Sequence, residues 1–182
     1  VLDQDGYVTN HKLVKDLTNK DRNSVMIGGN FCQWYGGFDS YVIAQVFKDD
    51  IRVPSMGRKV EGEEQMPELY HLPYMDWTSW IKELNKHKYG VHLMRTHAAG
   101  TFALNCAYLG IPCIGYKGLD TQEICHPSTT VDVGDLGHAR KIARELKTNK
   151  EYYRNCSKIA KFNYEQNYKE EKWLEKTKLW LQ

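Results

Sequence analysis

Six short apolar runs, separated by polar stretches, organise the hydrophobic pattern of this chain. The runs are apolar or β-branched, and each is bounded by Gly or Pro, which is typical of buried strands. They lie at residues 25–27, 51–53, 69–72, 91–94, 111–114 and 130–133.

Stretches with helical spacing alternate with these runs. They lie at 40–48, 76–87 and 102–109, with Asp76 as the N-cap of the second helix and Gly110 at the end of the third. After the last run the pattern predicts only helices, at 135–147, 150–164 and 167–181. The alternation predicts an α/β fold, a Rossmann-like, doubly wound parallel sheet with helices on both faces and a C-terminal helical tail.

The chain is expected to form a single domain over residues 1–182, with a linker or helix at about 1–23 and C-terminal helices at about 150–182. With 41% apolar residues and a mean hydropathy of −0.63, it is long enough to bury a core. Its apolar runs are too short for a transmembrane helix, and no signal peptide is expected, so the expected location is cytoplasmic. A net charge of +2 argues against binding to nucleic acid.

Charge is unevenly distributed along the chain. Residues 138–182 contain 12 Lys and Arg against 6 Asp and Glu, whereas the preceding residues carry a net charge of −4. Basic terminal helices can contact an anionic surface such as the cytoplasmic face of a membrane, and the alternative is an ordinary solvated helix face. The five cysteines form no C-x-x-C pair, so neither a zinc ribbon nor a disulfide framework is expected, and Cys106 and Cys113 are expected to be buried thiols.

The loops after the strands of a parallel sheet are where ligands bind. Gly28 and Gly29 follow the first predicted strand, where glycine lets the backbone approach a phosphate group.

Segment 95–114 contains the most informative motif of the chain. A strand ends in a polar loop that contains His97 and Gly100, a helix containing Asn105 follows, and Gly110 leads into Ile-Pro-Cys-Ile. His97 and Asn105 lie eight positions apart, so both fit on one face of the loop and helix. This segment resembles the C-terminal, nucleotide-sugar-binding half of the GT-B glycosyltransferases, and most of all the group-one class.

The resemblance covers about residues 24–182. In that class an E-x7-E segment with an internal glycine precedes a Gly-x-Pro-Val-Ile run. Here Gly100 matches the internal glycine, residues 110–114 match the run, and residues 118–124 are similar to the Gly-Gly-x-x-Glu-Ile loop. The resemblance implies binding of a nucleotide-diphosphate sugar for glycosyl transfer to an unknown acceptor, with no metal and no other cofactor. It also implies that the acceptor-binding domain lies outside this chain or in a partner chain.

Two departures from the family pattern bear on the chemistry. His97 and Asn105 occupy the positions of the two glutamates, and residues 28–38 lack the basic pair of the family. The resemblance implies that His97, the candidate catalytic residue, contacts the donor sugar, and that Asn105 contacts the ribose. An asparagine can pair with hydroxyl groups, but without the strength of a carboxylate.

Stabilisation of the leaving diphosphate requires positive charge or helix dipoles. The candidate cations are Arg58, Lys59, Arg95 and Lys117, each of which is alternatively an ordinary surface charge. Tyr74 and Met75 follow the third strand, where the family's nucleobase rests. The other candidate donor-binding residues are Gly28, Gly29, Thr96, Gly100, Thr101, Asn105 and Glu123. The acidic stretch with Glu61, Glu63, Glu64 and Glu68 is expected to be solvated and outside the pocket.

Two other functions fit the same fold. One is another enzyme of this type, such as a sugar-nucleotide epimerase. The other is a degenerate, non-catalytic module whose cleft binds a protein partner, which the missing glutamates and the missing basic pair favour.

Overall fold

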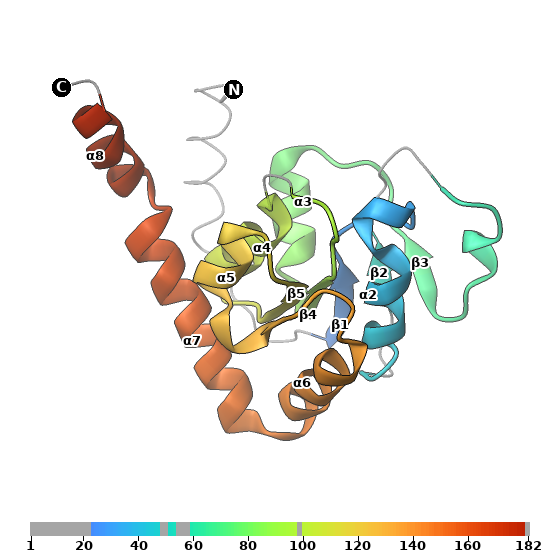
Figure 1. The fold of residues 1–182 in the computed structure, drawn as a ribbon. Coiled ribbons are helices and arrows are strands. Elements are labelled where there is room, and N and C mark those ends of the chain that lie inside the picture. The colour runs from blue at the N-terminus through green and yellow to red at the C-terminus, as the bar shows by residue number, and fades with distance from the viewer. Residues whose placement is uncertain (1–22, 48–50, 54–58, 98–99, 181–182) are drawn as a thin grey trace.

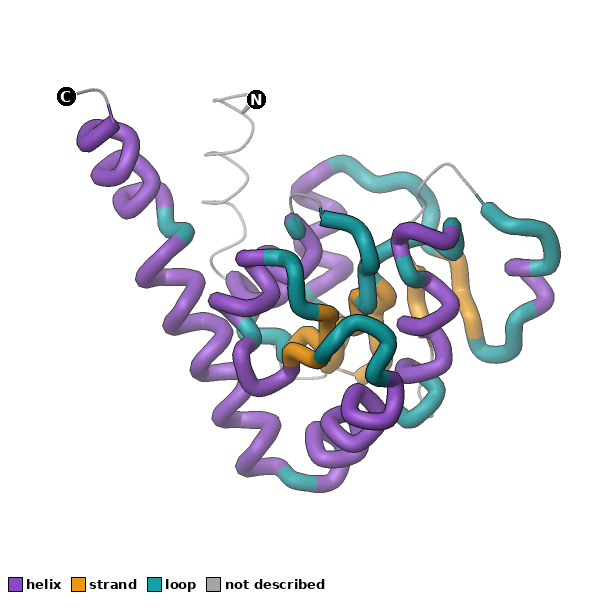
Figure 2. Tube along the Cα trace, in the orientation of Figure 1, coloured by secondary structure: helices purple, strands orange, loops and turns teal. Residues whose placement is uncertain are grey.

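The computed structural model describes residues 23–47, 51–53, 59–97 and 100–180, and they form a parallel sheet between layers of helices (Figures 1 and 2). Within this part of the chain the six strands are ordered β3-β2-β1-β4-β5-β6. Their bounds are β1 Asn23–Ile27, β2 Ile51–Val53, β3 Leu69–His71, β4 His87–His92, β5 Cys113–Tyr116 and β6 Thr130–Val131. The predicted doubly wound sheet is confirmed, and its strand order reverses between β1 and β4.

Helices cover both faces of the sheet. The first face packs against α2 (Gly37–Ala44) and α6 (Leu136–Thr148). The second packs against α3 (Trp77–Leu84), α4 (Thr101–Leu109) and α5 (Asp120–Cys125). Figure 1 shows α7 (Lys150–Asn167) along one side of the molecule, in contact with α4, α5 and α6, and α8 (Glu170–Trp180) continuing from it.

The sheet is buried on both faces because successive side chains of a strand point in opposite directions. On β1, Val25 and Ile27 join the core beneath α2 and α6, whereas Met26 joins the core beneath α3 and α4. Cys106 and Cys113 belong to the second core as buried free thiols, as expected. None of the helices in the described ranges is long and apolar enough to cross a bilayer.

Local signals correctly located several helix ends. The Asp76 carboxylate accepts the Ser79 N–H at 3.0 Å and caps α3, and Gly110 ends α4 with a left-handed φ of 65°. By contrast, α3 ends at Leu84, because β4 begins at His87, four positions before the predicted strand. Pairing with β1 extends β4 toward its N-terminus, since Asn23 lies opposite His87.

Local structure differs from the predicted elements in two further places. Most of segment 118–124, which resembles a loop of the family, lies in the short helix α5. The fifth strand begins at Cys113, two positions later than expected, and runs to Tyr116, one residue beyond the Gly115 that was expected to end it.

Candidate functional site

The start of α4 lies at the carboxyl edge of the sheet, next to the point where the strand order reverses. Its N-cap, Gly100, has a left-handed φ of 61°, and a Cβ at this position would collide with Oγ1 of Thr121. The Thr121 hydroxyl donates to the Gly100 carbonyl at 3.0 Å, so α5 holds the turn in place. The N–H groups of the first turn of α4, which have no partner within the helix itself, point toward this edge and favour an anion.

A chain of hydrogen bonds joins the loops after β4 and β5. Nδ1 of His97 donates to the Gly118 carbonyl at 2.5 Å, and the Gly118 N–H donates to Oε1 of Glu123 at 2.8 Å. Because a carbonyl only accepts, Nδ1 carries the hydrogen, and Nε2 is the nitrogen left for a ligand. Hydrogen bonds therefore hold three predicted site residues, His97, Gly100 and Glu123, close to one another. Glu123 was predicted to contact the donor, and in the structure its carboxylate bonds to the loop after β5.

Gly28 and Gly29 continue from β1 on the other side of the strand reversal. A Cβ at Gly28 would collide with the ring of Phe102 and would lie 2.8 Å from Cγ of His92. Only a glycine therefore lets the loop after β1 lie against both β4 and the first turn of α4. The predicted glycine pair and the predicted helix start are thus neighbours in space.

His92, the last residue of β4, is a polar residue of this site that the sequence analysis missed. It is 6% exposed, and neither ring nitrogen has a hydrogen-bond partner among the described residues. Burial lowers its pKa to about 4, so the imidazole is neutral near pH 7. The signal in the sequence was a histidine within an apolar run, close to the glycine loop of a neighbouring strand.

Each candidate cation in the described ranges is paired with a carboxylate. Nη2 of Arg95 lies 2.7 Å from Oδ2 of Asp39, a residue in the first turn of α2. The other two pairs are Lys117 with Asp132, at 2.7 Å, and Lys59 with Glu64, at 3.0 Å. Arg58 lies outside the described residues. These exposed pairs are weak, so a diphosphate must compete with them but is not prevented from binding.

The Asp39 carboxylate also accepts the hydroxyl of Tyr116, at 2.9 Å, so it joins α2, the loop after β4 and the end of β5. Burial, together with this carboxylate, raises the pKa of Tyr116 to about 12. Thr96, the neighbour of Arg95, donates its hydroxyl to the Trp34 carbonyl at 3.1 Å. Arg95 and Thr96 therefore tie the loop after β4 to the segment between β1 and α2.

The remaining candidates are dispersed around this edge or within α4. Tyr74 is 87% exposed after β3, Met75 beside it is partly buried, and Asn105 is buried within α4. Their roles as contacts for ribose and nucleobase stay predictions.

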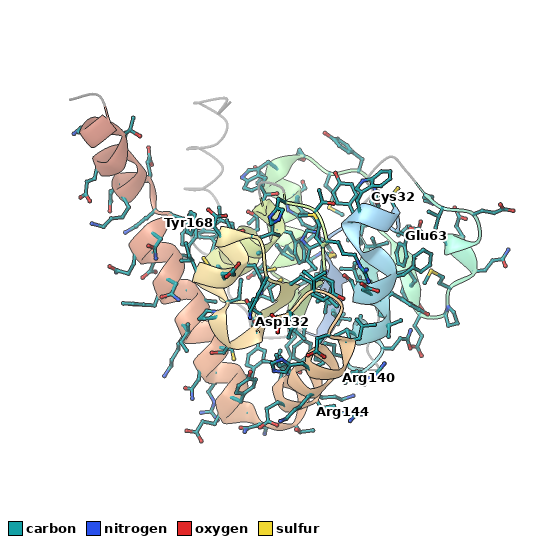
Figure 3. The ribbon with its side chains drawn as sticks, viewed as in Figure 1. Cys32, Glu63, Asp132, Arg140, Arg144 and Tyr168 are labelled. Carbon is teal, nitrogen blue, oxygen red and sulfur yellow. The ribbon has the colours of Figure 1, made fainter. Side chains whose placement is uncertain are left out.

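The acidic stretch is correctly predicted to be exposed, except at Glu63. This carboxylate is 2% exposed, accepts the Val60 N–H at 2.9 Å and lies 2.7 Å from Nε2 of His71. These two partners compensate for the burial of the Glu63 carboxylate, which is labelled in Figure 3. The bond to His71 connects the loop of Glu63 to the end of β3. Among the described residues no cluster of three or more His, Cys, Asp or Glu side chains could hold a metal ion.

Comparisons with known proteins bear on the fold. No family model and no curated protein sequence matches the chain. Sucrose-phosphate synthase from Thermosynechococcus elongatus superposes with a TM-score of 0.70 at 13% identity, over 94% of this chain and 48% of that protein. HepE from Anabaena, solved in complex with UDP-glucose, superposes with a TM-score of 0.67 at 13% identity, over 89% of this chain and 49% of that protein.

A third solved structure is an isolated domain. It is the C-terminal domain of the group 1 glycosyltransferase LpcC from Francisella tularensis, with a TM-score of 0.61 at 12% identity, over 82% of this chain and 88% of that domain.

These likenesses define the class by fold. The chain has the fold of the C-terminal domain of GT-B glycosyltransferases, and it spans about half the length of sucrose-phosphate synthase and HepE. The resemblance to the nucleotide-sugar-binding, C-terminal domain of the group-one type is thereby confirmed at the level of the fold.

Proposed function

We propose that this chain is the donor-binding domain of a glycosyltransferase, which binds a nucleotide-diphosphate sugar and acts together with an acceptor-binding domain or partner chain. The observation that carries the proposal is the start of α4 at the strand reversal, framed by Gly100, Thr121 and the bond from His97 to Gly118. Support comes from the glycosyltransferases of the same fold, one of them solved with UDP-glucose.

In this proposal the protein's own groups bind the donor without a metal. The N–H groups of the first turn of α4 receive the diphosphate and stabilise the charge that develops when the glycosyl bond breaks. Nε2 of His97 bonds to the donor sugar and the amide of Asn105 bonds to the ribose, while Tyr74 and Met75 lie against the base. Arg95 and Lys117 add charge when they exchange their carboxylate partners for the ligand.

Calorimetric titration with UDP, GDP and ADP, and with their sugars, tests the proposal. We expect weak, saturable binding to one nucleotide series and no glycosyl transfer by this chain alone. Asn105→Ala should weaken binding by roughly 2- to 13-fold, which is the effect of losing one uncharged hydrogen bond. Asn155→Ala, at an exposed position on α7, is the matched control and should bind like the parent.

The outcomes separate the candidate functions. A folded protein that binds none of these ligands would contradict the proposal and favour the non-catalytic module, for which the ion pairing of the described candidate cations is an argument. Turnover of UDP-GlcNAc without an acceptor, measured on a longer protein that contains this chain, would favour an epimerase.

A further inference from the structure

His92 contacts both elements that form the proposed donor site. Its ring lies beside Gly28 of the loop after β1, and it meets the ring of Phe102, in the first turn of α4, edge to face, with the ring centres 5.5 Å apart. On the other side, His92 pairs in register with Gly115 of β5. The imidazole therefore lies against the glycine loop and the ring of Phe102, and the Gln122 side chain covers Gly115 beside it.

The orientation of the His92 ring follows from its contacts with the two glycines. Its Cγ lies next to Gly28, whereas Nε2 lies next to Gly29, 3.1 Å from the position that a Cβ of Gly29 would occupy. Because Gly29 is one residue further along the chain than Gly28, the ring points toward the carboxyl edge of the sheet. Nε2 is thus the end of His92 that is nearest to the proposed donor site.

A buried imidazole without partners is costly for the unliganded protein. On folding, the two ring nitrogens lose their hydrogen bonds with water and gain none from the described residues, whereas an apolar side chain of similar size has no such bonds to lose. His87 and His126, the other two buried histidines with lowered pKa values, bond to Ser24 and to Ala103 and Cys113, respectively. Of these three histidines, only the one under the glycine loop has both ring nitrogens unpartnered among the described residues.

We propose that His92 is a donor-contacting residue, whose Nε2–H bonds to a diphosphate oxygen of the nucleotide sugar between Gly28–Gly29 and the start of α4. The inference rests on the proposed function and assigns to a buried neutral histidine part of the role that a basic residue in segment 28–38 would otherwise have. Such a bond, from a neutral donor to an anionic oxygen, belongs to the stronger class of hydrogen bonds.

The proposal predicts that nucleotide binding depends on pH, because His92 should become protonated more readily in the complex than in the free protein. The described residues around His92 are Gly28, Gly29, Gly115 and Phe102, with Tyr35 beside Gly29 and Gln122 beside Gly115. None of them carries a charge near pH 7, and burial lowers the pKa of His92. A bound diphosphate would be the first charge near the ring and would raise that pKa. Nucleotide affinity of the parent should therefore increase as the pH is lowered from about 7 to about 5. The increase that is due to His92 should be absent from a variant without this histidine.

His92→Leu is the central test, with UDP, GDP and ADP titrated into the full chain. We expect the variant to unfold at the same or a higher temperature than the parent, because the orphaned polar group is gone. Its nucleotide affinity should be about 10- to 150-fold weaker, the effect of losing a hydrogen bond to a charged group. His87→Gln, at the opposite end of the same strand, is the matched control and should retain the parent's affinity.

A second measurement does not depend on a variant. Titration of UDP, GDP or ADP into protein labelled at histidine should shift the ring nitrogen resonances of His92 and leave those of His87 and His126 in place. Parental affinity in His92→Leu, or unshifted His92 resonances at saturation, would overturn the inference while leaving the proposed function standing. Absence of nucleotide binding by the parent would overturn both.

Discussion

Three histidines of this protein, His87, His92 and His126, are buried and neutral because burial lowers the pKa of each to about 4. In the unfolded chain the same side chains have pKa values of about 6.5. As the pH falls below that value the unfolded state takes up protons that the native state does not bind, so the free energy of unfolding decreases. Their effect lies between about pH 6.5 and about pH 4.

We therefore expect urea denaturation to show a steady loss of stability from about pH 7 to about pH 5. His92→Leu should flatten this dependence by removing one of the three sites of proton uptake. Asn155→Ala, at an exposed position on α7 that does not titrate, should leave it unchanged. A free energy of unfolding that is constant over this range would contradict the interpretation.

The Asp39 carboxylate pairs with Arg95 and therefore competes with an anionic ligand for the guanidinium. Asp39→Asn should release the guanidinium while keeping an oxygen that can accept the Tyr116 hydroxyl. Because exposed ion pairs contribute about 0.2–1 kcal/mol, nucleotide binding should become roughly 1.4- to 5-fold tighter in calorimetry. The gain should disappear at high salt, and weaker binding would show that Asp39 itself serves the ligand.

At the scale of elements, the position of α4 depends on α5. Thr121 is buried and its hydroxyl bonds to the Gly100 carbonyl, whereas Thr129, equally buried, bonds to the Cys113 carbonyl in β5. Valine at either position removes one such bond and should cost about 0.5–1.5 kcal/mol of stability. Thr121→Val alone should also weaken nucleotide binding, since the Thr121 hydroxyl bonds to the turn before α4 and the Thr129 hydroxyl does not. Equal binding by the two variants in a parallel titration would contradict that view.

At the scale of the whole molecule, basic side chains gather on the last helices. Arg140 and Arg144 lie on α6 (Figure 3), and Lys158 and Lys161 are exposed on α7 beside Phe162, which is 60% exposed. Cations around an exposed aromatic ring suit an anionic lipid surface. Contact of a membrane with the exposed face of α7 around Phe162 stays a prediction.

Cosedimentation with phosphatidylserine vesicles at low salt tests this contact. We expect binding that is lost at high salt and is absent for phosphatidylcholine vesicles, because screening removes the attraction. The double variant Lys158→Glu and Lys161→Glu should abolish it. No binding by the parent to the anionic vesicles would leave these side chains as an ordinary solvated face.

The order of strands and helices was determined by the sequence itself, because periodicity and capping are local properties. Asp76 and Gly110 specify helix ends through their own backbone neighbours, and the start of α4 at Gly100 follows from one left-handed residue. The short runs bounded by Gly or Pro located every described strand, although the ends of several were wrong.

Interactions between distant segments were decided only by the tertiary structure. β4 begins at His87 because β1 lies beside it, and Arg95 pairs with a carboxylate 56 positions earlier in the chain. His92 is buried, and its ring nitrogens have no partner in the described part of the chain, because the Gly28–Gly29 loop and the ring of Phe102 lie against it. No local pattern encodes such partners, since the strand order brings them together, and burial then determines which polar groups keep a partner.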